Sequence, residues 1–284
     1  MLIRPMLADD ALLADIRAAG VSGGGFRLWW LGQSGFLVQW QGRHLLLDPY
    51  LSDSLTKKYA ATDKPHVRMT ERAVDPARLD FIDAVTSSHN HTDHLDAETL
   101  TPVLAARPRA VLVIPEANRA FVAERLHIDA ALPVGVDDGI SVDAAGFEIT
   151  GVPAAHEELE RDAQGRHKFL GYVVRFGSWT IYHSGDTLRY EGMAEKLRPF
   201  GVDVALLPIN GRAPERRVAG NLNGREAARL AYDMGVKLAI PCHYEMFEFN
   251  TASPDEFVAE AARLSQPCDV VRCGERWESG ELAP

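Results

Sequence analysis

The chain has 284 residues, of which 46% are hydrophobic and 25% charged, as in an ordinary globular protein. Its formal net charge of −10 argues against a nucleic-acid partner, because the chain has no overall basic field to release counterions. No apolar run of about 18 residues predicts a membrane span, and the three cysteines show no paired CxxC spacing. We therefore expect one cytoplasmic domain over residues 1–284 that binds a small-molecule substrate and neither nucleic acid nor membrane, with self-association into a homo-oligomer left open.

The first predicted elements are a short helix and a group of strands. An amphipathic helix is predicted over residues 8–19, and the acidic and basic residues of this stretch indicate that it is not a secretory signal. The polar residues 52–73 predict a long loop, which is either disordered or functional, for example as a lid. The strands between them are predicted over residues 26–31, 36–40 and 44–47, with a turn over residues 32–35.

The most informative segment follows a buried strand predicted over residues 81–86. There the chain carries three histidines and an aspartate within six residues, namely His89, His91, Asp93 and His94. His89 and His91 are two apart and point the same way in an extended stretch, which leaves Asp93 and His94 to face a second position. Imidazole and carboxylate suit zinc, iron or manganese. The segment therefore predicts ligands for two metals, because solvated histidines in a polar loop are a poor explanation for this spacing.

Three further ligand-type residues stand alone downstream, each just after a predicted strand. Loops at strand ends on a rigid scaffold are where functional side chains concentrate, so all three can collect at one edge of a sheet. They are His156, Asp186 and His243, and the strands before them are predicted over residues 147–152, 179–183 and 238–240. His183 is expected to orient a ligand or fill the core, and the remaining histidines, His44, His66, His127 and His167, are assigned to the surface or the core.

The other elements alternate strands with helices. Strands are predicted over residues 110–114, 140–142, 171–176 and 202–207, and helices over residues 96–106, 116–126, 192–197, 224–234 and 254–264. Mixed strands with interspersed helices, in halves covering about 26–142 and 147–273, predict an α+β fold in which two sheets share one core and helices lie outside.

The ligand spacing resembles the metallo-β-lactamase superfamily, which is characterised by His-x-His-x-Asp-His followed by a lone His, Asp and His. The segments around Asp186 and over 207–212, 220–223 and 240–247 are similar to the L-ascorbate-6-phosphate lactonase-like (UlaG-type) branch, with Glu245 where that branch is expected to carry Asp. The resemblance implies an αββα sandwich, in which two mixed β-sheets are flanked by helices. It also implies that Asp48 supports the site from behind, although a cap on the turn before Pro49 explains this residue equally well.

The resemblance further implies two metal positions bridged by Asp186. His89, His91 and His156 would hold the first ion, and Asp93, His94 and His243 the second. Two divalent ions, zinc or manganese, would share one hydroxide and polarise the group that it attacks. Asp93 and Asp186 are accordingly the candidate catalytic residues, and Asp93 can also handle the proton.

A basic segment after the strand over 202–207 is the candidate for substrate binding. Arg212 and Arg216 can grip a phosphate or carboxylate through bidentate hydrogen bonds, or they form a solvated run that pairs with Glu215 and Glu226. Tyr244 can donate to an oxyanion, or it is a core aromatic with a satisfied hydroxyl. The full set of expected substrate contacts is Asn210, Arg212, Arg216 and Tyr244.

These patterns predict a metal-dependent hydrolase. The ligand set predicts the hydrolase, and the resemblance narrows the substrate to a lactone or another ester with an anionic group. A phosphodiesterase of the same fold is the alternative within hydrolases. A non-catalytic metal-binding sensor or scaffold is the alternative from another class, and it is disfavoured because no ligand is missing.

Overall fold

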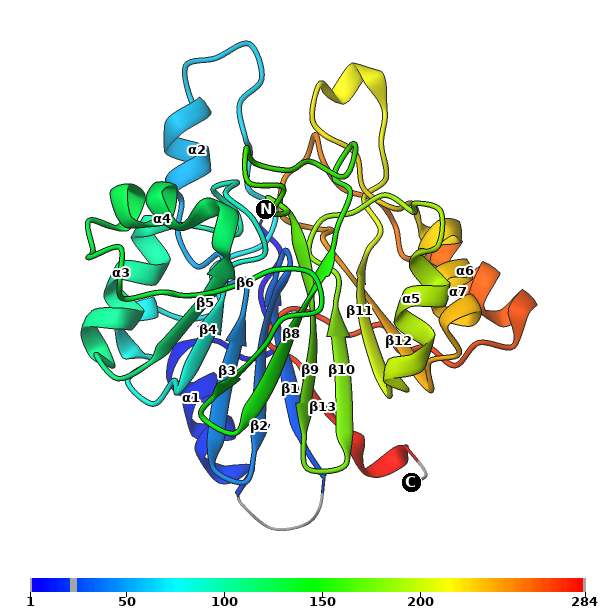
Figure 1. The fold of residues 1–284 in the computed structure, drawn as a ribbon, viewed down its shortest axis with the longest axis horizontal. Coiled ribbons are helices and arrows are strands. Elements are labelled where there is room, and N and C mark those ends of the chain that lie inside the picture. Colours follow the sequence, from blue (N-terminus) through cyan, green and yellow to red (C-terminus); the bar gives the residue numbers. More distant parts are fainter. Residues whose placement is uncertain (1, 21–24, 283–284) are drawn as a thin grey trace.

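Two mixed β-sheets lie against each other between two layers of helices in the computed structural model, which describes residues 2–20 and 25–282. The described residues leave out the ends of the predicted domain and part of the stretch before the first strand, namely residues 1, 21–24 and 283–284. Figure 1 shows α3 and α4 outside the first sheet and α5, α6 and α7 outside the second. The predicted α+β sandwich with outer helices is confirmed.

The first sheet has the order β13-β1-β2-β3-β4-β5-β6. Its strands are β1 (Arg27–Gly32), β2 (Gly35–Trp40), β3 (Arg43–Leu47), β4 (Ala84–Thr86), β5 (Val111–Pro115), β6 (Val134–Val136) and β13 (Arg276–Glu278). The second sheet has the order β12-β11-β10-β9-β8-β7. Its strands are β7 (Ser141–Ala144), β8 (Phe147–Pro153), β9 (Leu170–Phe176), β10 (Trp179–His183), β11 (Val204–Pro208) and β12 (Leu238–Cys242).

The α-helices are α1 (Asp9–Ala18), α2 (Ser54–Tyr59), α3 (Ala97–Ala106), α4 (Arg119–Leu126), α5 (Met193–Leu197), α6 (Gly224–Met234) and α7 (Asp255–Leu264). Short 3-10 turns are η1 (Pro76–Arg78), η2 (Glu116–Asn118), η3 (Arg198–Phe200), η4 (Pro214–Arg216) and η5 (Ser279–Glu281). None of the helices in the described ranges is long and apolar enough to cross a membrane.

Local sequence explains why these elements begin and end where they do. β11 and β12, the edge strand, are parallel neighbours in the second sheet, and every residue of both is buried, as expected for strands covered on both faces. α6 begins with a capping box in which Asn223 and Glu226 bond each other's backbone N–H, and it ends at Gly235 in the left-handed conformation. One hydrophobic cluster runs through both sheets and includes Val85 of the first and Leu206 of the second.

The structure departs from the sequence predictions in four places. β6 and β13 were not predicted, because three residues are too few to show an alternating pattern. The strand predicted over 81–86 is shorter, since only β4 is extended there. The stretch predicted as a loop over 52–73 contains α2. The predicted halves are also shifted: β7 pairs with β8 in the second sheet, whereas β13 returns to pair with β1 in the first.

Candidate metal centre

Four loops bring the predicted ligands together above the ends of the strands. β8, β10 and β12 run in the same direction, because β9 is antiparallel to both β8 and β10 while β11 is parallel to both β10 and β12. The loops that follow them therefore leave the second sheet at the same edge, where they meet the loop after β4. The loop after β4 carries His89, His91, Asp93 and His94, and the other three carry His156, Asp186 and His243.

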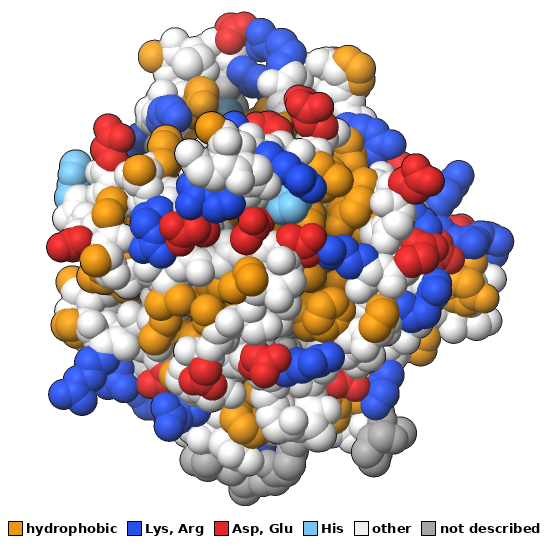
Figure 2. All heavy atoms as spheres, viewed as in Figure 1, with side chains coloured by type: hydrophobic (Ala, Val, Ile, Leu, Met, Phe, Trp, Pro, Cys, Tyr) orange, Lys and Arg blue, Asp and Glu red, His pale blue; other side chains and the backbone are white. Residues whose placement is uncertain are grey.

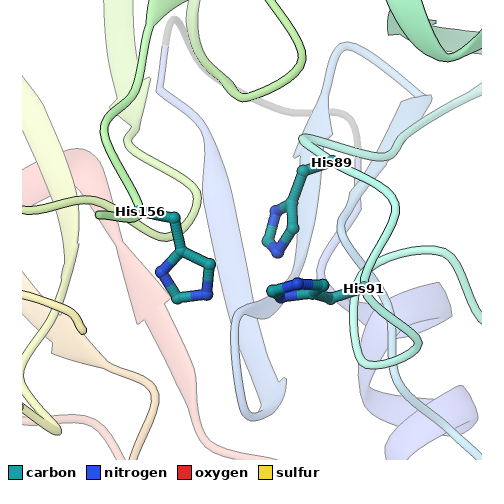
Figure 3. Close-up of side chains that lie close together, drawn as sticks. All are labelled: His89, His91 and His156. Atoms are coloured by element: carbon teal, nitrogen blue, oxygen red, sulfur yellow. The ribbon is translucent and has the colours of Figure 1, made fainter. Parts of the chain in front are cut away.

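The first cluster consists of three histidines. The ring centroids of His89 and His91 lie 4.7 Å apart, and those of His156 lie 5.4 Å from His89 and 4.9 Å from His91. Figure 3 shows the three rings converging, with His156 on one loop and the other two on another. One nitrogen of each ring lies within 4.8 Å of the others, which is close enough for all three to bind one ion.

The second cluster consists of Asp93, His94, Asp186 and His243. Oδ2 of Asp186 lies 3.2 Å from Nε2 of His243, and Oδ1 lies 3.2 Å from Nε2 of His94. Oδ2 also lies 3.5 Å from Nε2 of His156, which belongs to the first cluster. Asp186 therefore stands between the two clusters, at the place predicted for a bridging carboxylate.

Hydrogen bonds to the outer nitrogens of the histidine rings fix the orientation of these rings. Nδ1 of His94 lies 2.8 Å from Oδ2 of Asp48, and Nδ1 of His156 lies 2.9 Å from the carbonyl oxygen of Gly220. Bonds of this kind hold Nδ1 outward and direct Nε2 toward the centre, as in known metal sites. Of the two explanations for Asp48, the structure shows the side chain supporting the site, since its carboxylate also accepts from the backbone N–H of Ser88.

Ser88 and Gly185 pack together beneath both clusters. Oγ of Ser88 lies 3.0 Å from Nδ1 of His89 and 3.3 Å from Nδ1 of His94. Gly185 approaches Ser88 so closely that a Cβ at Gly185 would lie 2.7 Å from that Oγ, and its φ of +59° is a conformation that favours glycine. The loop that carries Asp186 can therefore lie this close only because residue 185 has no side chain.

The buried polar atoms fit a divalent cation. Nε2 of His89 is buried and has no hydrogen-bond partner within the described residues, and Nε2 of His94 and Oδ1 of Asp186, also buried, form no hydrogen bond beyond their own 3.2 Å ion pair. Leaving such an atom without a partner costs about 1–3 kcal/mol. Because all three atoms face the centre of the clusters and are of the types that bind zinc or manganese, ion binding would satisfy them.

Burial and charge set the protonation of these groups. Burial lowers the pKa of His89 well below its usual range, which leaves the ring neutral and able to bind a metal. Burial acts in the same direction on His243, but the carboxylates of Asp186 and Asp93 outweigh it and raise the pKa of His243 to about 9. For Asp186, burial alone would raise the pKa, but His243 and His94 hold it well below its usual range. A cation that binds the second cluster must therefore displace protons from the histidines.

Gln33 lies in the turn predicted over residues 32–35 and is also a residue of the site. Its side chain is buried, and its Nε2 donates to Oδ2 of Asp93 over 2.7 Å. Its backbone carbonyl accepts from the N–H of His243 over 2.9 Å. No sequence signal identifies this role, because a glutamine in a short turn is not a typical metal ligand.

A cavity of about 340 Å³ opens above the clusters. Asp93, Asp186 and His243 lie at one side of it, and Lys58, Tyr59 and His66 from the predicted loop over 52–73 line another part. That segment therefore forms part of the wall of the site, and its closure as a lid stays a prediction. His66, assigned to the surface or the core from the sequence, lies at the cavity.

The four predicted substrate contacts lie elsewhere. Arg212 donates two hydrogen bonds to the carboxylate of Glu226, at 2.8 and 2.7 Å, so the alternative of an internal ion pair is the one observed. The guanidinium of Arg216 donates to the carbonyl oxygens of Asn210 and Thr251.

The other two candidates are also engaged in internal bonds. The side-chain amide of Asn210 donates to Asn250, and the hydroxyl of Tyr244 donates to the carbonyl of Val271 inside the core. None of these four described side chains lines the cavity, so their placement does not support the predicted contacts with substrate. Asn210 pairs with Asn223 at the start of α6, while Val218 and Ala219, at the far end of the basic segment, line the cavity.

Comparisons with known proteins agree with the fold. Residues 43–244 match the family described as the beta-lactamase superfamily domain. A UPF0173 metal-dependent hydrolase of Opitutus terrae is 31% identical over 257 residues, covering 89% of this chain and 99% of that protein. One of Rubrobacter xylanophilus is 27% identical over 253 residues, covering 87% of this chain and 93% of that protein. The metallo-beta-lactamase fold protein YhfI of Bacillus subtilis matches with a TM-score of 0.62 at 19% identity, covering 89% of this chain and 99% of that one.

The architecture is thus the metallo-β-lactamase fold, with the predicted ligand residues gathered at the ends of the strands. The chain belongs to the UPF0173 metal-dependent hydrolase family of the metallo-β-lactamase superfamily. The predicted resemblance to the superfamily and the prediction of a metal-dependent hydrolase are confirmed at this level. The nearer resemblance to the lactonase-like branch stays a prediction.

Proposed function

We propose that the protein hydrolyses a lactone or another ester, with two divalent ions held by its seven clustered ligands. The observation that carries this proposal is the position of Asp186, whose two oxygens lie 3.2–3.5 Å from histidines of both clusters. A carboxylate so placed can bind two ions at once and fix their separation, which is about 3.5–4 Å in binuclear hydrolases.

The chain's own residues assign the remaining roles. When bound, the ions, zinc or manganese, would supply Lewis acidity and lower the pKa of water toward neutrality. Asp93 lines the cavity beside the second cluster and is the carboxylate placed to take a proton from the attacking water. Gln33 donates to Oδ2 of Asp93, the oxygen that lies 3.5 Å from Nε2 of His243. No serine, cysteine or lysine nucleophile is required by this arrangement.

An anionic group on the substrate would meet Lys58. Two cations line the cavity, and Arg125 is already engaged, because its guanidinium donates to the carbonyls of Asn90 and Leu95 over 2.6 and 3.3 Å. Lys58 is exposed at the cavity and forms no ion pair with any described residue. Figure 2 shows basic and acidic side chains interspersed over the face in view, so attraction of an anion would depend on such local charges.

Metal content and turnover measured together test the proposal. Protein purified without chelator is loaded with zinc or manganese, and its metal content is determined by elemental analysis. We expect about two ions per chain and turnover of lactones or esters above that of phosphodiesters. Asp186→Ala should lose both ions and activity. One ion or fewer per chain after supplementation would overturn the binuclear centre, and two ions without any turnover would favour the sensor or scaffold.

A further inference from the structure

Four rings form one wall of the cavity, and we name them the aromatic wall: Tyr59, His66, Phe247 and Phe249. The ring of His66 stacks on Tyr59, with centroids 4.1 Å apart and planes 14° apart. Its other neighbours are Phe249, at 4.4 Å, and Phe247, at 5.3 Å, both edge to face. These separations are those of favourable aromatic pairs, so the wall is a packed surface and not a set of loose side chains.

The aromatic wall rests on a hydrophobic cluster of its own. Phe247 is buried with Tyr50, Leu55 and Met246 in a group separate from the main core, and Tyr59 and Phe249 pack against it. A satellite cluster of this kind is typical beneath a long loop. It gives the outer half of the site an apolar floor that the core of the two sheets does not provide.

Backbone hydrogen bonds fix the wall in place. Its members come from residues 59–66 and 247–249, and the segments that carry them pair as in a short ladder. The N–H of Met69 donates to the carbonyl of Met246 over 2.8 Å, and that of Glu248 donates to the carbonyl of Val67 over 3.0 Å. Because the second segment begins four residues after His243, the position of the wall is tied directly to a predicted metal ligand.

The four rings of the wall carry no charge themselves, although the ammonium groups of Lys58 and Lys64 lie over the rings of Tyr59 and Phe249, 5.1 and 4.8 Å from the centroids. Burial lowers the pKa of His66, so its ring is neutral at physiological pH. Nδ1 of His66 lies 3.2 Å from the carbonyl oxygen of Lys64, which assigns the proton of the neutral ring to that nitrogen. The imidazole is therefore a neutral member of the wall, stacked on the ring of Tyr59.

We infer that the aromatic wall binds a flat, uncharged ring of the substrate, fused or attached next to the scissile carbonyl. This inference rests on the proposed function. A carbonyl held at the clusters must direct the rest of the molecule into the same cavity of about 340 Å³, which suits a small molecule of one or two rings. Hydrolysis adds water to the carbonyl carbon and breaks the acyl C–O bond to leave a hydroxy acid, so no other reactant is needed.

A matched pair of substrates tests the inference. Dihydrocoumarin and δ-valerolactone share the same lactone ring, and only the former carries a fused aromatic ring. Tyr59→Leu and Phe249→Leu should lower kcat/KM for dihydrocoumarin by about two- to tenfold while sparing δ-valerolactone, which is the range expected for one lost aromatic contact. Tyr232→Leu on α6 is the control, because Tyr232 is 48% exposed and does not line the cavity. Equal losses on both substrates would overturn the inference.

A binding measurement on analogues that cannot be hydrolysed tests the inference independently of the proposed function. Chroman and tetrahydropyran are the carbonyl-free analogues of the two lactones, and saturation-transfer NMR on the metal-loaded protein compares their binding. Chroman should bind more tightly, and the two wall variants should weaken it where Tyr232→Leu does not. If chroman binds in this way and neither lactone is hydrolysed, the wall is supported and the proposed function fails. If the variants leave chroman binding unchanged, the wall is not a binding surface.

Discussion

The side-chain amide of Gln33 donates to Oδ2 of Asp93 over 2.7 Å, although the two residues are 60 positions apart. The same glutamine accepts from the backbone N–H of His243 through its carbonyl oxygen. The turn between β1 and β2 thereby positions two proposed ligands that come from different sheets. A residue that touches no ion can thus determine the geometry of the second cluster.

We expect Gln33→Met to weaken the second metal position. Methionine fills a similar volume and donates no hydrogen bond, and a bond to a charged group typically contributes about 1.5–3 kcal/mol. Affinity for the second ion, measured by calorimetry, should fall about tenfold or more, with the first ion retained. Gln39→Met is the matched control, because Gln39 is buried in β2 and bonds the carbonyl of Ile16. Equal metal binding by the two variants would show that Gln33 does not position Asp93.

Gly185→Ala should disturb the histidines as well as the fold. A Cβ at this position would lie 2.7 Å from Ser88, so the serine beneath His89 and His94 must move. The alanine backbone would also have to keep a φ of +59°. Strain of this kind costs on the order of 1–3 kcal/mol, and metal affinity should fall with stability. Gly139→Ala is the control: its φ is +71°, and its Cβ would meet nothing within 4 Å. If both variants lose stability and both keep full metal affinity, the contact with Ser88 is not required.

The stability of the metal-free protein should fall as the pH rises from neutral. The carboxylates of Asp186 and Asp93 outweigh burial and raise the pKa of His243 from its ordinary 6.5 to about 9. A raised pKa in the folded state stabilises the folded protein fully below pH 6.5, and this contribution is lost as the pH passes through about 9. Denaturant unfolding of metal-free protein over this range should show a steeper decline than in His243→Gln. Identical slopes would contradict a protonated His243.

Arg212→Ala should leave catalysis intact. Arg212 is half exposed and pairs with Glu226 away from the cavity, and such surface pairs contribute about 0.2–1 kcal/mol to stability. Lys58→Ala, at the cavity, should instead lower kcat/KM for an anionic ester relative to a neutral one. The two variants differ only in which cation is removed. A selective loss of the anionic ester in Arg212→Ala would instead support the predicted contact between Arg212 and the substrate.

The part of the site that could be predicted is the part in which residues of ligand type stand close together in the sequence. His89, His91, Asp93 and His94 stand so close in the sequence that their gathering needed little tertiary information. The roles of Gln33 and His66 could not be predicted, because they follow from contacts between distant segments and not from residue type. Arg212 has the chemistry of an anion-binding residue, but the direction of its side chain depends on the start of α6.

In the fold as well, some elements could be predicted from local sequence and others could not. Long strands and helices were predicted from their periodicity, and α6 begins and ends at the residues predicted for it. β6 and β13 have three residues each, and their extended conformation depends on a neighbouring strand that the local pattern does not reveal.

β13 also determines what β1 presents to other molecules. Phe26, next to β1, bonds Ser279, next to β13, across 253 positions, and Leu28 of β1 is paired with Trp277. β1 carries the apolar run Leu28, Trp29 and Trp30, which would be an adhesive edge if its hydrogen-bonding groups were free. β13 covers that edge with only three residues, and its Arg276 and Glu278 are exposed and paired with each other at 3.0 Å. A short, charged strand thus ends the sheet and protects the protein against edge-to-edge aggregation.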